Sequence, residues 1–103
     1  RGLDIYITEL DVDDSSFGHD ERERDERVAQ RYEAFLTKVL TVPQVKVIVL
    51  WQLADRFSWY RDPEVIKLLK SEPGARPLPF DDALKPKPAH AAIARALKSR
   101  AVV

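Results

Sequence analysis

Two short apolar segments flank one longer segment with helical periodicity, and this order is the strongest constraint on the fold. Residues 5–12 and 45–51 are rich in β-branched and aromatic side chains, as strands are. Between them, apolar side chains recur at the three- and four-residue steps of one helix face: Val28, Tyr32, Phe35, Leu36, Val39 and Leu40. A strand, a helix and a second strand in this order predict a βαβ unit of an α/β protein.

The apolar run of residues 45–51 is nearly continuous, which predicts a parallel strand covered on both faces. The helix before this strand is expected to start near Asp20, and Pro43 lies beyond its end. Residues 64–70 predict one short helical turn, and a last helix is expected from about Pro88.

Composition narrows the function. The chain has 103 residues, enough for one small domain with a modest core. Its 17 basic and 17 acidic side chains give a net charge of zero, which argues against nucleic acid or an anionic membrane surface as the partner. No apolar run reaches the roughly 20 residues of a membrane-spanning helix. The absence of cysteine excludes disulfides, thiol nucleophiles and thiolate metal sites.

The sequence carries no metal or cofactor signature. His19 and His90 lie far apart, without the spacing of metal ligands. The acids after the first strand suggest a calcium loop, but the pattern fails. Started at Asp11, it places Ser16 where glycine is required and Arg22 where the closing glutamate is required.

Arginines alternate with acids at the start of the long helix. Arg22, Arg24, Arg27 and Arg31 all lie among glutamates and aspartates. This alternation predicts a solvated face with exposed salt bridges rather than an RNA-binding stripe.

The first strand ends on two carboxylates, Glu9 and Asp11. If the strand stays extended, alternation places both on the same side. A glutamate among Ile, Tyr, Thr and Leu side chains would be desolvated unless a neighbouring group used its charge. The alternative is a strand end with two solvated acids.

Aromatic residues cluster where the second strand ends. Trp51 and Trp59 lie in residues 51–62, at the carboxyl end of a strand, where α/β barrels and open sheets hold their sites. Indole faces suit the apolar C–H patch of a sugar ring. The alternative places Trp51 in the core and makes Trp59 a loop anchor.

The chain has no methionine and begins with Arg1 directly before a strand. We expect it to be a piece of a longer protein whose first half is missing.

Together these features resemble the C-terminal end of family 10 glycoside hydrolases, the retaining endo-β-1,4-xylanases. The resemblance covers nearly the whole chain and is carried by four segments in order: residues 7–12, 50–59, 77–81 and 85–89. It implies a (β/α)8 TIM barrel, of which residues 1–103 supply the last two strand–helix units as a fragment.

The resemblance also implies roles for individual residues. Glu9 corresponds to the catalytic nucleophile at the end of the seventh strand, and Asp11 to a carboxylate that orients a histidine touching that nucleophile. Trp51 corresponds to a tryptophan lining the subsite of the sugar that is cleaved, and Trp59 to a lid tryptophan on the following loop.

Three loop residues complete the set that the resemblance implies. Asp55 and Arg56 correspond to a pair that shapes the lid, and Arg56 is also a candidate substrate contact. Gln52, a further candidate contact, stands where the family commonly has glycine, which would alter the loop turn or narrow the site.

By resemblance, the parent protein hydrolyses internal xylosidic bonds of xylan with retention and needs no cofactor. The acid/base glutamate belongs to the fourth strand, so we expect this chain alone to be inactive. Its expected partners are xylan or xylo-oligosaccharides, together with another copy or the missing barrel segment. The family suggests a secreted or periplasmic location. The alternatives are a non-catalytic assembly or carbohydrate-binding fragment of a degenerate barrel, and another barrel glycosidase family with a glutamate nucleophile on its seventh strand.

Overall fold

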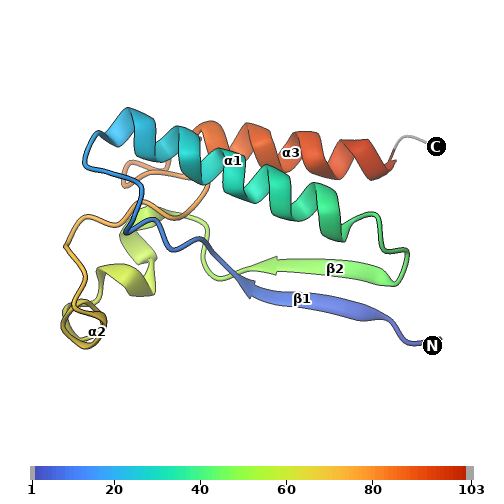
Figure 1. Ribbon diagram of the computed structural model, residues 1–103, viewed down its shortest axis with the longest axis horizontal. Coiled ribbons are helices and arrows are strands. Elements are labelled where there is room, and N and C mark those ends of the chain that lie inside the picture. The colour runs from blue at the N-terminus through green and yellow to red at the C-terminus, as the bar shows by residue number, and fades with distance from the viewer. Residues whose placement is uncertain (1, 102–103) are drawn as a thin grey trace.

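The computed structural model describes residues 2–101, so Arg1 and residues 102–103 lie outside the description. Two strands and three helices follow one another in the predicted order (Figure 1). Their bounds are β1 Ile5–Leu10, α1 Glu21–Val39, β2 Val45–Leu50, α2 Pro63–Leu69 and α3 Pro88–Ala101, with two 3-10 turns, η1 Asp55–Phe57 and η2 Trp59–Arg61, between β2 and α2. The predicted βαβ unit is confirmed.

The two strands form a parallel sheet. Their paired residues are Ile5 with Val45, Tyr6 with Val47, Ile7 with Ile48 and Leu10 with Leu50. The register shifts twice, after Ile5 and again between Ile7 and Leu10. The second irregularity lies at the carboxyl end of β1, where the candidate site residues begin.

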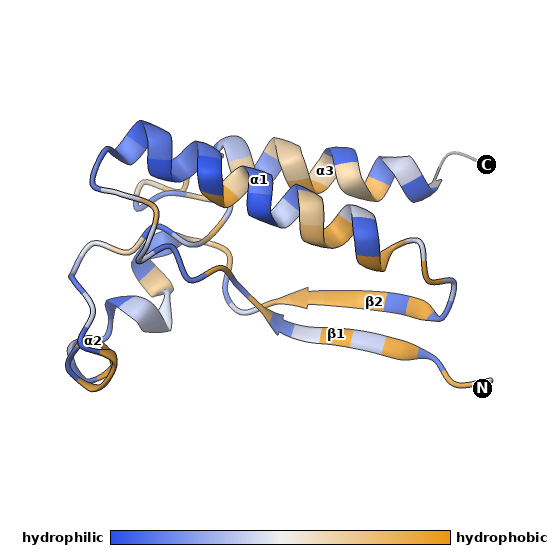
Figure 2. Ribbon diagram, in the orientation of Figure 1, coloured by the Kyte–Doolittle hydropathy of each residue, from blue (hydrophilic) through white to orange (hydrophobic). Residues whose placement is uncertain are grey.

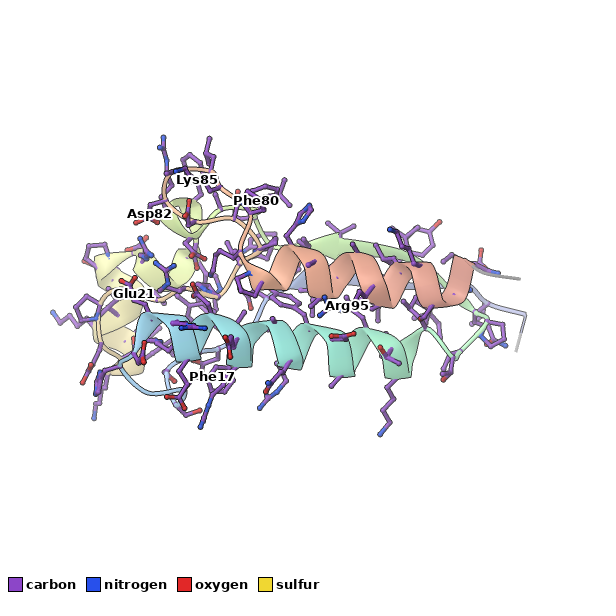
Figure 3. The ribbon with its side chains drawn as sticks, turned by 90° about the horizontal axis from the view of Figure 1, so that it is seen from above. Phe17, Glu21, Phe80, Asp82, Lys85 and Arg95 are labelled. Carbon is purple, nitrogen blue, oxygen red and sulfur yellow. The ribbon has the colours of Figure 1, made fainter. Side chains whose placement is uncertain are left out.

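Helices α1 and α3 lie side by side on one face of the sheet (Figures 1 and 3). The core under these helices combines small side chains with two large aromatic ones: Val12, Phe17, Val28, Ala29, Tyr32, Ala89 and Ala92. Among residues 2–101, no helix lies on the opposite face of the sheet (Figure 1), and the β2 side chain of Val49 is 46% exposed. The prediction that β2 is covered on both faces is therefore wrong for this chain, because both long helices pack on the same side.

Helix α1 begins polar and becomes more apolar toward its end (Figure 2). The carboxylate of Asp20 caps it by accepting a hydrogen bond from the backbone N–H of Arg22 at 3.0 Å. The side chains of Tyr32 and Leu36 are buried as predicted, but that of Phe35 is 40% exposed. Neighbouring helix positions lie about 100° apart, so Phe35 falls outside the narrow face that α1 buries.

The arginines of α1 do not all behave alike. Exposed salt bridges join Arg22 to Glu26 and Arg27 to Glu23, as predicted. Arg24 departs from the prediction, because its largely buried guanidinium lies 3.0 Å from the Asp14 carboxylate. The loop before α1 folds back and brings Asp14 against the first turns of the helix, which sequence periodicity could not show.

A groove of about 500 Å³ runs between the helices and the sheet. Its lining is mostly apolar: Leu36, Leu40, Val45, Lys46, Ile48, Leu50, Ile93, Leu97 and Arg100. The small residues Ala89, Ala92 and Ala96 are fully buried, whereas Leu97 is 46% exposed. Within residues 2–101, no helix is both long enough and apolar enough to cross a membrane.

Candidate active site

The candidate nucleophile lies on a distorted strand end. Glu9 is exposed and has a backbone φ of 56°, a conformation that non-glycine residues rarely adopt. It falls inside the irregular stretch of β1, between Ile7 and Leu10. The strand is therefore not extended at Glu9, and the alternation that would have placed Glu9 and Asp11 on the same side does not apply. A strained backbone of this kind is frequent at functional sites.

The main chain holds Trp51 next to the end of β1. The backbone N–H of Trp51 donates to the carbonyl oxygen of Leu10 at 2.9 Å, continuing the pairing of Leu10 with Leu50. Because Leu10 follows Glu9 directly, the candidate nucleophile and the first tryptophan meet at the same edge of the sheet. Within the described residues the Trp51 side chain is 43% exposed, so it is not part of the core that these residues form.

Gln52 follows with a φ of 82°. This left-handed conformation is the one that glycine adopts without strain. Gln52 therefore adopts, at the cost of local strain, a backbone conformation that suits the glycine expected at this position.

The second tryptophan contacts the residue that directly follows the first strand. The Nε1–H of Trp59 donates to Oδ2 of Asp11 at 2.8 Å, although 48 positions separate the two residues. The Trp59 ring centroid lies 4.7 Å from that of Tyr60. Ser58 is buried, and its hydroxyl accepts from the backbone N–H of Tyr60 at 3.1 Å, which holds η2 in place. Asp11 and Trp59 are thus brought together as one unit.

Two opposing effects act on the Asp11 carboxyl. Burial raises its pKa above the ordinary value of 3.8, because an ionised group loses solvation there, while the hydrogen bond from Trp59 lowers the pKa by favouring the charged form. The nearby Asp13 raises it further. The net direction is upward.

A buried ion pair lies beneath this loop. Nζ of Lys87 is 2.8 Å from Oδ2 of Asp55, and the other oxygen of Asp55 accepts from the backbone N–H of Leu78 at 2.9 Å. Lys87 also donates to the Arg76 carbonyl oxygen at 2.8 Å. Burial raises the pKa of Asp55, and the contacts with Lys87 oppose that rise. Asp55 therefore shapes the loop, as the resemblance implied.

The network continues from Arg76 to the start of α1. The guanidinium of Arg76 donates two hydrogen bonds of 2.8 Å to the Asp25 carboxylate. The backbone N–H of Arg76 donates to the Asp14 carboxylate at 2.8 Å. Sequence reasoning missed both Arg76 and Lys87, since neither lies in a recognisable charge pattern near its partner. The network joins the loop after β1, helix α1 and the loop after β2 into one rigid support.

Arg56 does not pair with its neighbour Asp55. Its guanidinium lies over the ring of Phe57, 4.8 Å from the centroid, and its Nη1 is 3.4 Å from the carbonyl oxygen of Asp82. Figure 3 shows Asp82 with Phe80 and Lys85 in the loop that extends beside the helices. Arg56 is exposed at this rim, so its role as a substrate contact stays a prediction.

An open groove of about 580 Å³ begins at the first tryptophan. It is lined by Val49, Leu50, Trp51, Gln52, Leu53, Ala54, Phe57 and Leu84. Glu9 and Trp59 lie outside this lining, so the structure does not gather every predicted site residue around one cavity. Within the described residues, no cluster of three His, Asp or Glu side chains could hold a metal ion.

This arrangement places an exposed carboxylate, Glu9, and two partly exposed indoles, Trp51 and Trp59, at the carboxyl end of β1 and on the loop after β2. A carboxylate there can act as a nucleophile or stabilise a positive charge, and indole faces can bind sugar rings. Glycoside hydrolysis also needs a second carboxyl group as general acid and base, and that group would have to lie outside these elements.

Several solved structures that are similar to this chain are xylanases. Xylanase 10B from Thermotoga maritima matches with a TM-score of 0.75 and 29% identity, over 96% of this chain and 28% of that one. The Thermotoga petrophila enzyme, solved with xylobiose, gives the same values. Xylanase 10C from Cellvibrio japonicus, a mutant solved with xylopentaose, matches with a TM-score of 0.78 and 27% identity, over 95% of this chain and 22% of that one.

The chain therefore spans less than a third of the length of the xylanases that it matches. The two strands of this chain and the helices that follow them correspond to a fragment of the TIM barrel of these xylanases, as predicted. No individual curated protein matches the chain by sequence. The family model for glycosyl hydrolase family 10 matches residues 1–96, which is nearly the whole chain. The chain thus belongs to glycosyl hydrolase family 10.

Proposed function

We propose that this chain supplies the nucleophile to a barrel that hydrolyses internal β-1,4-xylosidic bonds of xylan with retention of configuration. The observation that carries the proposal is the position of Glu9. It is an exposed carboxylate on a strained strand end, next to Trp51 through the hydrogen bond between Trp51 and Leu10. Membership of the family and the xylo-oligosaccharides in two similar structures support xylan as the substrate class.

In this mechanism the Glu9 carboxylate attacks the anomeric carbon and forms a xylosyl–enzyme ester. The glycosidic C–O bond breaks, and the departing oxygen takes a proton from an acid in another part of the barrel. Water then attacks the same carbon, gives its proton to that group and releases Glu9. Retaining enzymes hold the two carboxyl groups about 5–5.5 Å apart.

The other site residues bind or position groups around this step. Trp51 and Trp59 offer indole faces to the sugar rings, with both side chains partly exposed. Gln52 and Arg56, exposed on the same loop, contact the substrate at its edges. Asp11 orients a histidine that touches Glu9.

The chain alone is inactive in this proposal, since it carries one of the two carboxyl groups that the reaction needs. General acid–base assistance typically contributes about 10²–10⁴-fold to the rate. Activity therefore requires the remainder of the barrel.

The remainder of the barrel docks on the open surfaces of this chain. The two-stranded sheet has two unpaired edges, its uncovered face exposes Val49, and the groove along Leu97 is apolar. Exposed strand edges and apolar faces of this kind pair readily with further strands. Without the remainder of the barrel, the chain is expected to pair with a second copy instead. Sedimentation experiments would then detect a dimer.

The test is intact-mass labelling with a 2-fluoro-xylobioside that bears an activated leaving group. Such a substrate needs little acid assistance, so it reports on the nucleophile itself. We expect a xylobiosyl adduct on Glu9 when the rest of a family 10 barrel is present. Glu9→Gln should abolish labelling, and Glu64→Gln, an exposed glutamate on α2, should not change it.

Two results would contradict the proposal. An adduct on a residue other than Glu9 would remove its role as nucleophile. No adduct in the restored barrel would favour a non-catalytic, carbohydrate-binding fragment, which xylobiose binding without turnover would then identify.

A further inference from the structure

The Asp11 carboxylate has a partner that the family resemblance does not assign. The resemblance gives Asp11 a histidine, whereas within residues 2–101 its hydrogen-bond partner is the indole of Trp59, at 2.8 Å on Oδ2. Bonds of this length to an ionised acceptor are stronger than bonds between neutral groups. This bond joins the strand of the candidate nucleophile to the loop of the lid tryptophan.

Other contacts fix the same loop from its far side. Arg61, at the end of η2, donates from Nε to the Ala75 carbonyl oxygen at 2.6 Å and pairs with Asp82 at 2.8 Å. The hydroxyl of Ser58 holds the start of η2. These bonds restrain the backbone around Trp59, but its side chain reaches β1 through Asp11. The ring orientation therefore depends on this single carboxylate and on the packing against Tyr60.

We propose that Asp11 is a positioning residue that holds the indole of Trp59 at the carboxyl end of β1, so that one aromatic wall of the substrate site is preorganised before a sugar binds. The relevance to substrate rests on the function proposed above. The hydrogen bond between Asp11 and Trp59 does not depend on that function. The positioning role of Asp11 and the nucleophilic role of Glu9 can therefore fail separately. The carboxylate can accept both hydrogen bonds, because Oδ2 accepts from Trp59 and Oδ1 has no donor among residues 2–101, so it can accept from a group elsewhere in the barrel.

The two tryptophans of this chain form an internal control. Trp51 is 43% exposed and Trp59 is 40% exposed, yet within residues 2–101 only the Trp59 indole N–H has a hydrogen-bond acceptor. In the 103-residue chain without sugar, hydrogen exchange of the two indole N–H groups is measured by NMR, with signals assigned by Trp59→Phe. We expect the Trp59 indole to exchange about tenfold more slowly than that of Trp51.

Substitutions at Asp11 then separate a hydrogen bond from general packing. Asp11→Leu removes the acceptor and should bring the Trp59 exchange rate up to that of Trp51, while Asp11→Asn keeps an acceptor and should retain part of the protection. Asp13→Asn removes a neighbouring charge and should leave both rates unchanged.

Equal exchange of the two indoles in the unsubstituted chain would overturn the proposal, and so would unchanged protection of Trp59 in Asp11→Leu. If Asp11→Leu does not fold, the comparison of the two indoles and the Asp11→Asn variant still decide the matter. Labelling of Glu9 tests the proposed function independently, since it does not report on the Trp59 hydrogen bond.

Discussion

Glu9 and Gln52 adopt the same left-handed backbone conformation at the carboxyl ends of two adjacent parallel strands. Their φ angles are 56° and 82°, and both side chains are exposed. For residues other than glycine this conformation costs roughly 1–2 kcal/mol. The chain therefore stores strain on both strands at the edge where its candidate site lies, and this strain can be measured.

Replacing Glu9 by glycine should relieve strain while removing the candidate nucleophile. We expect Glu9→Gly to be more stable than Glu9→Ala by about 1 kcal/mol, because both lose the carboxylate but only alanine keeps the Cβ that disfavours positive φ. Urea unfolding of the two variants measures this difference. Equal stabilities would show that Glu9 is not strained.

Gln52 allows the same test with a matched control. We expect Gln52→Gly to raise the free energy of unfolding by roughly 0.5–1 kcal/mol, because glycine adopts the observed φ without strain. Gln44 lies in the turn before β2 and has a negative φ, so Gln44→Gly should lower the free energy of unfolding. If both substitutions lower it, the expected strain at Gln52 is absent.

Lys87 should be the most sensitive charged residue. Lys87→Met leaves the buried carboxylate of Asp55 without its cation, a change that typically costs about 3–5 kcal/mol. Adding Asp55→Asn should recover part of this loss, since the amide carries no charge and its oxygen still accepts from Leu78. Thermal unfolding of the single and double variants gives the two values.

The exposed pair of Arg95 and Glu33 provides the control for that experiment. Arg95 lies on the side of α3 that faces α1 (Figure 3), and its guanidinium is 2.8 Å from the Glu33 carboxylate. Solvent screens this pair, so Arg95→Met should cost far less than Lys87→Met. Similar losses for the two variants would mean that burial does not set the importance of Lys87.

The pKa of Asp11 should lie above its ordinary value of 3.8, and Trp59→Phe should raise it further. Phenylalanine removes the N–H that favours the charged carboxylate, whereas Tyr60→Phe keeps that N–H and should have little effect. Titration followed by carboxyl NMR measures both. A lower pKa in Trp59→Phe would contradict the hydrogen bond.

This shift has a defined sign for stability. Because the folded chain binds the Asp11 proton more tightly than the unfolded chain does, the contribution of Asp11 to the free energy of unfolding is largest below pH 3.8. That contribution falls as the pH rises through the raised pKa. Asp11→Asn should remove this component of the pH dependence.

Local sequence patterns predicted the elements well. The bounds of α1 and β2 follow from apolar periodicity and from Asp20 as a cap, because a long amphipathic helix and a β-branched strand each repeat one local rule. The prediction that both faces of β2 are covered was wrong. An apolar strand sequence does not show which face of the strand is packed against other parts of its own chain.

The details of the site were harder to predict. Nothing in the sequence marks the positive φ of Glu9, because that conformation is usually signalled by glycine or asparagine. The contacts of Trp59 with Asp11 and of Lys87 with Asp55 join residues far apart in the chain. Local sequence periodicity therefore cannot predict these contacts. The positions of Glu9, Trp51 and Trp59 at strand ends marked them as candidates, whereas their individual roles followed only from the resemblance to the family.

The hydrogen bond from Trp51 to Leu10 is made by main-chain atoms only. Its geometry therefore does not depend on which side chains surround it. The main chain therefore sets how the strand end that carries Glu9 lies relative to Trp51. Exchanging the side chains of the loop after β2 should therefore leave the spacing of the two strand ends unchanged.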